Sequence, residues 1–226
     1  IMAFVLFTFF LGICLGKIFG VHHRTSFLLS AGAAICGATA IAAVAPIIKA
    51  KPQEILISIT IIFLLNAIAI IVFPILGNSL DMSNHQFGVW SALAIHDTSS
   101  VMAASLSYSN ESAQVAATLK LGRTIWIIPL LLISSLFFKS ETKKIKFPIF
   151  IIFFLLAIVS NTLIDFSDNF LLILLNTSQY LLLTGLFCIG TQSNIPDLRL
   201  LNIRPVMLAL GLWLVVIPLS YIITLL

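Results

Sequence analysis

Long apolar runs are the feature that most restricts what this chain can fold into. Runs of about 20 apolar residues recur along its length, the size needed to cross a bilayer as a helix. Hydrophobic residues make up 60% of the chain and charged residues only 9%. Within lipid, helices and closed barrels alone satisfy their own backbone hydrogen bonds, and continuous apolar runs select helices. We therefore predict an all-α membrane protein with the lipid bilayer as its surroundings.

Eight membrane-spanning segments account for these runs. Their predicted bounds are 1–19, 26–48, 53–76, 87–107, 112–138, 147–163, 169–192 and 204–226. We group them into one transmembrane domain over residues 1–226, in which 1–76 is the remainder of a first repeat and 87–226 is a second, inverted repeat. Because Ile1 already lies inside an apolar run, we expect further spans before it.

Charged residues between the runs predict the orientation. If every segment crosses the membrane, one side collects the cations Lys17, Arg24, Lys139, Lys143, Lys144, Lys146, Arg199 and Arg204 and the acids Asp81, Glu141 and Asp197. The other side holds Lys49, Lys51, Glu54, Glu111, Asp165 and Asp168. The positive-inside rule then puts the first set in the cytoplasm and the carboxyl terminus outside. The net charge of +4 thus indicates topology and not a nucleic-acid partner.

An unusual segment lies midway along the second run. Residues 30–39 hold glycines and small polar side chains where an ordinary span would hold Leu, Ile or Phe. Adding 153 to a residue number relates this segment to 184–194, so that Gly32 matches Gly185 and Gly37 matches Gly190. The predicted topology sends the two segments through the membrane in opposite directions, as in the inverted repeats of secondary transporters.

These two segments predict a pair of broken, crossing helices that build a substrate site. Glycine lets the backbone unwind, and the half-helix amino-termini present free N–H groups that suit an anion. The candidate substrate-binding residues here are Gly32, Cys36, Gly37, Gly190, Thr191 and Gln192. The alternative is close helix packing through small residues with no break.

Two cations inside the fifth run are the other candidate substrate-binding residues. Lys120 and Arg123 lie two to three turns from its start, and their three-residue spacing puts them on one face of a helix. A charge at such depth costs several kcal/mol unless it is paired or hydrated, so it usually marks a transport pathway. The alternatives are snorkelling to the surface, or a structural ion pair with Asp97 or Glu111.

A polar sequence in the middle of the fourth run supplies candidates for ion coupling. His96 and Asp97 are followed by Ser99 and Ser100. A histidine titrates near neutral pH, and a neighbouring carboxylate can orient it or take a proton. The alternative is a buried polar network that only ties helices together. The three cysteines lack metal-ligand spacing, so we expect neither a metal site nor a cofactor.

At these positions the sequence resembles the bacterial YeiH-like family of sulfate exporters. The resemblance rests on residues 30–40 (SAGAAICGATA), 90–104 (WSALAIHDTSSVMAA), 117–129 (ATLKLGRTIWIIP) and 185–194 (GLFCIGTQSN). It implies an exporter of sulfate or a related oxyanion or sulfonate, with about three more amino-terminal spans. It also implies a location in the bacterial inner membrane and an architecture similar to that of sodium/proton antiporters and bile-acid symporters.

The leading interpretation is a secondary active transporter that exports a small anion by alternating access, coupled to a proton or to sodium. An anion channel would share the cations but would conduct continuously. A membrane enzyme using His96, and a scaffold or receptor that transports nothing, are weaker interpretations. We expect no enzymatic activity, and no nucleotide-binding motif suggests a pump. Association into a homo-oligomer is compatible with these features.

Overall fold

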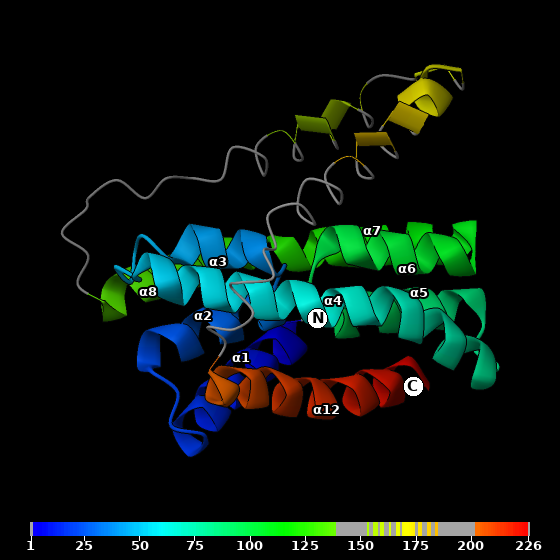
Figure 1. Ribbon diagram of the computed structural model, residues 1–226. Helices are drawn as coiled ribbons and strands as arrows, with labels where there is room; N and C mark the ends of the chain where they lie inside the picture. The colour runs from blue at the N-terminus through cyan, green and yellow to red at the C-terminus, as the bar shows by residue number, and fades with distance from the viewer. Residues whose placement is uncertain are drawn as a thin grey trace. The chain divides into compact units, whose positions relative to one another are not determined.

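The computed structural model describes residues 2–138 and 202–225 and, between them, only scattered residues from 153 to 184 (Figure 1). Regular structure in the described residues is helical, which confirms the prediction of an all-α membrane protein. The chain divides into two compact units, residues 1–143 with 195–226, and residues 144–194. The predicted spans 147–163 and 169–192 lie outside the continuously described residues.

Nine helices are described in the first unit. They are α1 (Met2–Ile18), α2 (His23–Ala34), α3 (Ala38–Val44), α4 (Pro52–Ser79), α5 (Asn84–Ala94), α6 (Thr98–Tyr108), α7 (Asn110–Thr124), α8 (Ile127–Phe137) and α12 (Ile203–Leu225). Three stretches are long and apolar enough to cross a membrane, namely Pro52–Ser79, Asn110–Ser135 and Ile203–Leu225. They match the predicted spans 53–76, 112–138 and 204–226. The shorter α1 is also apolar.

Helix α4 is the axis along which the other elements are arranged. Its 28 residues extend over about 42 Å, more than the hydrocarbon thickness of a bilayer. Two stripes with the same helical spacing run along it. The exposed stripe is Leu64, Ile68, Ile71 and Ile75, and the buried stripe is Ile62, Asn66, Ala69 and Phe73. One side of α4 thus suits lipid, while the other packs against the protein.

Helices α2 and α3 form a hairpin, which we call the first hairpin. The helical backbone stops after Ala34 and resumes at Ala38, and Gly37 between them has φ +64°. A Cβ on Gly32 of α2 would lie 3.0 Å from the Ile41 side chain of α3. In an unbroken helix these two residues would be about 13 Å apart along the axis. The chain therefore turns back on itself at 35–37.

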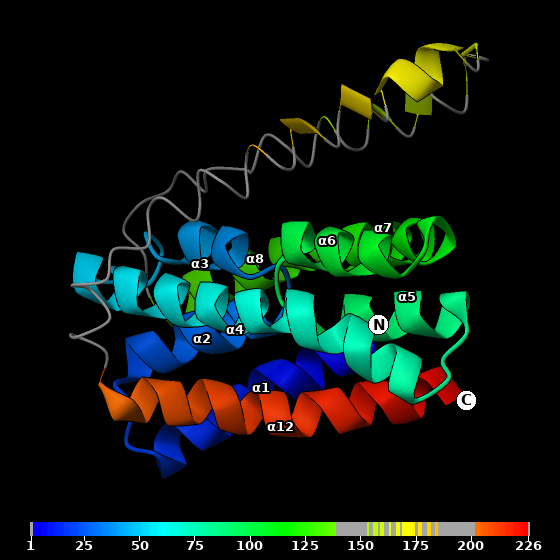
Figure 2. The same ribbon diagram turned by 45° about the vertical axis from the view of Figure 1, so that its right-hand side comes forward.

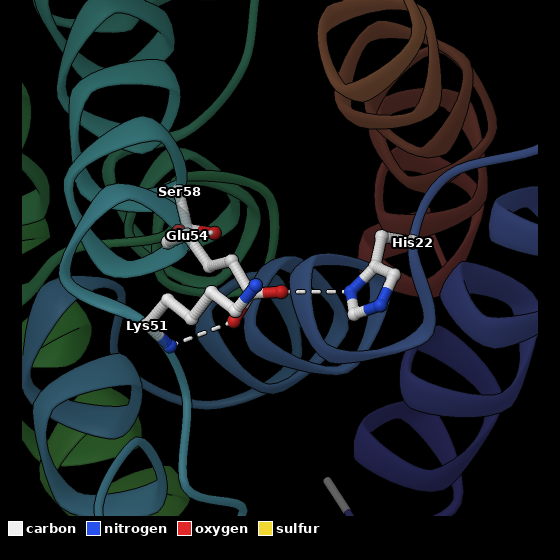
Figure 3. A network of polar contacts seen from close by, with 4 residues as sticks. All are labelled: His22, Lys51, Glu54 and Ser58. Atoms are coloured by element: carbon white, nitrogen blue, oxygen red, sulfur yellow. Dashed lines mark hydrogen bonds and ion pairs between the residues drawn. The ribbon is translucent and has the colours of Figure 1, made fainter.

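Polar contacts at the open end of the first hairpin show where it begins and ends. The Nδ1 of His22, just before α2, lies 2.7 Å from Oε1 of Glu54 in the first turn of α4 (Figure 3). The other Glu54 oxygen accepts a 2.7 Å hydrogen bond from the Lys51 backbone N–H and so caps α4. The hairpin therefore leaves and returns at the same end of α4. The prediction that 26–48 crosses the membrane was wrong, because the break reverses the chain.

Helices α5 and α6 form the second hairpin, at the other end of α4. Across it, the hydroxyl oxygens of Ser91 and Ser105 are 2.8 Å apart, and the rings of Phe87 and Tyr108 stack at 4.0 Å. The Asn84 amide, at the start of α5, donates a 3.0 Å hydrogen bond to Glu111 at the start of α7. The prediction that 87–107 crosses the membrane was therefore wrong as well, although its polar interruption is the turn of the hairpin.

Figures 1 and 2 show the first hairpin beside the first half of α4 and the second hairpin beside its second half. Because each hairpin returns to its own end of α4, the charged residues are grouped differently from the two sides predicted from the sequence. The end of α4 near Pro52, called here the basic end, collects Lys17, Arg24, Lys49, Lys51, Arg204 and Glu54. The opposite, acidic end has Asp81 and Glu111 and no Lys or Arg among the described residues. Lys49, Lys51, Glu54 and Asp81 had each been assigned to the wrong side.

Candidate functional site

The tips of the two hairpins meet at the middle of α4. We call residues 35–37 the first tip and 95–97 the second tip. A Cβ on Gly37 would lie 3.2 Å from both Cα and Cβ of Asp97, so the two backbones touch at this point. The His96 backbone N–H donates a 3.2 Å hydrogen bond to Oδ1 of Asn66, which fixes the second tip to α4. The break predicted at Gly37 therefore has a partner at 95–97.

Arg123 holds the ends of α2 and α5 together. Its Nε and Nη2 donate to the Ala34 and Ala33 carbonyls at 2.7 and 2.6 Å. Its Nη1 donates to Ala92 and Leu93 at 3.1 and 2.7 Å. Both sets are carbonyl groups in the last turn of a helix, where the backbone carries partial negative charge. A buried guanidinium thus neutralises two helix ends at once, with four of its five N–H groups engaged.

Lys120 binds a backbone carbonyl of the second tip. Its ammonium donates a 2.7 Å hydrogen bond to the Ile95 carbonyl, and its side chain is completely buried. It therefore does not snorkel to the surface. Neither Lys120 nor Arg123 forms an ion pair with a carboxylate among the residues that the structure describes. The sequence correctly placed both cations at depth, but their backbone partners had no signal in the sequence.

Asp97 caps the second arm of its hairpin. Its Oδ2 accepts hydrogen bonds from the Ser99 and Ser100 backbone N–H groups at 3.0 and 3.2 Å, and from the Ser100 hydroxyl at 3.4 Å. A carboxylate in this position stabilises a helix amino-terminus through both hydrogen bonding and the helix dipole. Asp97, Ser99 and Ser100 therefore form one unit, as their proximity in the sequence suggested.

The ring of His96 lies near Trp213 of helix α12. The ring centroid lies 6.3 Å from that of Trp213 on α12, whose indole N–H donates to the Ala94 carbonyl at 3.2 Å. Both His96 ring nitrogens and Nδ2 of Asn66 are buried without a hydrogen-bond partner among the described residues. Asn66 is not among the site residues predicted from the sequence. The signal that marks it is a lone amide within an apolar run.

The charge balance at the tips is positive. Among the described buried residues at this level, Lys120 and Arg123 carry two positive charges and Asp97 carries one negative charge. The carboxyl ends of α2 and α5 and the amino ends of α3 and α6 contribute partial charges of opposite sign, which largely cancel. Counted as formal charges, one positive charge is therefore left over among the described residues, in a region of low dielectric where a charge attracts an anion more strongly than in water.

The remaining candidate residues divide into two groups. Gly32 packs against Ile41 inside the first hairpin, and Cys36 is buried in the first tip next to Gly37. Gly190, Thr191 and Gln192 lie outside the described residues, so their part in the site stays a prediction. No group of His, Cys, Asp or Glu suited to a metal ion occurs in the described part of the chain.

These features define a multi-helix membrane protein with two opposed re-entrant hairpins whose tips meet beside buried cations. The chain belongs to the family described as Conserved hypothetical protein 698, whose model matches residues 1–209. It is 43% identical over 201 residues to a UPF0324 membrane protein of Bacteroides thetaiotaomicron, covering 88% of this chain and 61% of that protein.

Two further relatives have the same description. A UPF0324 membrane protein of Photobacterium profundum is 40% identical over 96% of this chain and 66% of its own length. One from Geobacter sulfurreducens is 39% identical over 94% of this chain and 68% of its own length. The chain thus spans about two thirds of the length of these curated relatives. No solved structure matches it.

Proposed function

We propose that this chain forms the core of a secondary active transporter that exports a small anion. The observation that carries the proposal is the meeting of two hairpin tips that come from opposite ends of α4. Irregular backbone at membrane depth occurs where protein buries it or where it lines a cavity. In secondary transporters, inverted elements with interrupted helices meet at a substrate site near the membrane midplane.

The two hairpins suit alternating access because each one opens toward its own end of α4. Withdrawal of the first tip would admit solvent from the basic end, and withdrawal of the second tip would admit it from the acidic end. By the positive-inside rule, the basic end faces the bacterial cytoplasm, the acidic end faces outward, and α12 ends outside. Closing one tip before the other withdraws would prevent a continuous pore.

Charge supports a small anion as the substrate. Lys120 and Arg123 outweigh Asp97 by one positive charge in the described site. The resemblance to YeiH-like proteins favours sulfate, sulfite or a sulfonate among such anions. The cations would act mainly through their field, because their hydrogen bonds go to the Ile95 carbonyl and to the ends of α2 and α5. Asp97 would take the proton or sodium ion that drives export.

The deciding experiment is uptake into proteoliposomes. The purified protein is reconstituted, and entry of labelled sulfate, sulfite and methanesulfonate is followed with and without an imposed pH or sodium gradient. Saturable uptake of one of these anions that responds to a gradient is the expected result. Uptake no faster than in empty liposomes for all three would contradict the proposal. Sustained single-channel conductance would instead establish the anion channel.

A further inference from the structure

Two side chains, Asn66 of α4 and His96 of the second tip, have hydrogen-bonding capacity that the described residues leave unused. Asn66 and His96 are 2% and 1% exposed, yet Nδ2 of Asn66 and both ring nitrogens of His96 have no partner within the described residues. Buried polar groups are satisfied in more than nine cases out of ten, roughly, and an unsatisfied one costs about 1–3 kcal/mol. Three such atoms on two linked residues indicate that something else binds there.

The orientation of the Asn66 amide follows from its one protein contact. Its partner is the His96 backbone N–H, a donor, so the amide atom facing it at 3.2 Å must be the oxygen. The nitrogen of the amide is therefore the free atom and offers two N–H groups. A neutral imidazole adds one N–H and one acceptor nitrogen. The unused capacity consists mainly of donors, which select a ligand rich in acceptor oxygens.

The side chains around Asn66 and His96 further restrict the charge and the shape of a ligand that can bind there. The excess positive charge of Lys120 and Arg123 over Asp97 favours an anion, although both cations already bind backbone carbonyls. The centroid of the Trp213 ring lies 6.3 Å from that of His96, and the Trp213 N–H donates its hydrogen bond to the Ala94 carbonyl. Trp213 therefore forms an apolar wall and does not satisfy the free atoms.

We propose that Asn66 and His96 are the direct ligands of the transported oxyanion, which binds between α4, the second tip and α12. This inference rests on the proposed function and moves the site away from Lys120 and Arg123, which the sequence favoured. The two cations hold the tips and supply the field, while neutral donors contact the anion oxygens. Neutral ligands also let the anion leave again, since the binding pair contains no direct salt bridge.

The test measures equilibrium binding of radiolabelled sulfate, sulfite and methanesulfonate to the purified protein in detergent. Asn66→Asp keeps an oxygen for the His96 backbone N–H and removes both free donors. His96→Leu removes a ring that makes no hydrogen bond to the described protein. Each variant should weaken binding of the preferred anion by about tenfold or more. His96→Leu should keep the wild-type thermal unfolding and gel-filtration profiles, whereas Asn66→Asp should melt at a lower temperature because it buries a carboxyl group. His96→Gln, which keeps a donor and an acceptor, should restore part of the affinity.

Ser26→Ala is the matched control. The Ser26 hydroxyl is also buried without a partner among the described residues, but it lies near Gly16 toward the basic end, two turns or more from the first tip. Its variant should bind the anion like the wild type. Wild-type affinity in both Asn66→Asp and His96→Leu would overturn the assigned site and leave the transporter standing. Binding of none of the three anions by the wild-type protein would overturn both.

Discussion

Gly37 faces Asp97 so closely that a methyl group on Gly37 would lie 3.2 Å from both Cα and Cβ of Asp97. The backbone of Gly37 also has φ +64° and ψ −129°, a conformation that side chains disfavour strongly. Contact and conformation therefore both require glycine at the point where the two hairpins meet.

Gly37→Ala should consequently destabilise the protein by about 1–3 kcal/mol and slow anion uptake, because the tips cannot close. The measurement is thermal unfolding in detergent, together with uptake into proteoliposomes. Gly122→Ala on α7 is the control, since that glycine is helical and a methyl group added to it would meet no atom within 4 Å. It should gain stability by roughly 0.5–1 kcal/mol. Equal melting temperatures for the two variants would argue against the tip contact.

Arg123→Lys should be strongly destabilising although it conserves the charge. A lysine cannot reach the carbonyls at the ends of both α2 and α5, so several of the four hydrogen bonds are lost. We expect a loss of about 3 kcal/mol or more in the free energy of unfolding. Denaturant unfolding or yield of monodisperse protein would measure it. A variant that is folded and stable but inactive would instead support direct anion binding by the guanidinium.

Labelling of single cysteines should place Lys51 with Lys17, and Glu111 with Asp81. In a background without the three native cysteines, Lys17→Cys and Lys51→Cys should react with a membrane-impermeant thiol reagent from one side of sealed vesicles. Asp81→Cys and Glu111→Cys should react from the other side. Eight simple crossings would instead pair Lys51 with Glu111 and Lys17 with Asp81. The pattern of labelling therefore decides between hairpins and crossings.

Asp97→Asn should leave the fold intact and disturb the coupling. An asparagine oxygen can still cap α6 through the Ser99 and Ser100 N–H groups, so stability should change by less than about 1 kcal/mol. Without a titratable or negatively charged group, uptake should lose its response to a pH or sodium gradient. Asp97→Ala is the comparison, and should also lose about 1 kcal/mol of cap stability. Gradient-driven uptake at the wild-type rate by Asp97→Asn would exclude a coupling role.

Local features of the sequence were sufficient for much of this architecture. The apolar pattern predicted α4 and α12, and the small residues around Gly37 predicted a break where the helix stops. The polar residues after Ile95 marked the second interruption. These features succeed because helix formation and helix termination depend on neighbouring residues and on the surrounding lipid.

The direction of the chain after each break was not predictable in the same way. A run of about twenty apolar residues has the length of either a crossing helix or a hairpin with two short arms. The difference lies in tertiary contacts, such as Gly32 with Ile41 and Ser91 with Ser105. The sequence did contain one indication of the first hairpin. If 26–48 crosses the membrane, Lys49 and Lys51 lie on the outer side, against the positive-inside rule. The partners of Arg123 are backbone carbonyls, which any sequence offers.

The return of each hairpin to its own end of α4 has a consequence for how such a chain can change during evolution. A segment that crosses the membrane reverses the orientation of everything that follows it, so gaining or losing one is disruptive. A hairpin that returns leaves the later helices facing as before. A hairpin of this kind can therefore be inserted or deleted without reversing the orientation of the rest of the chain.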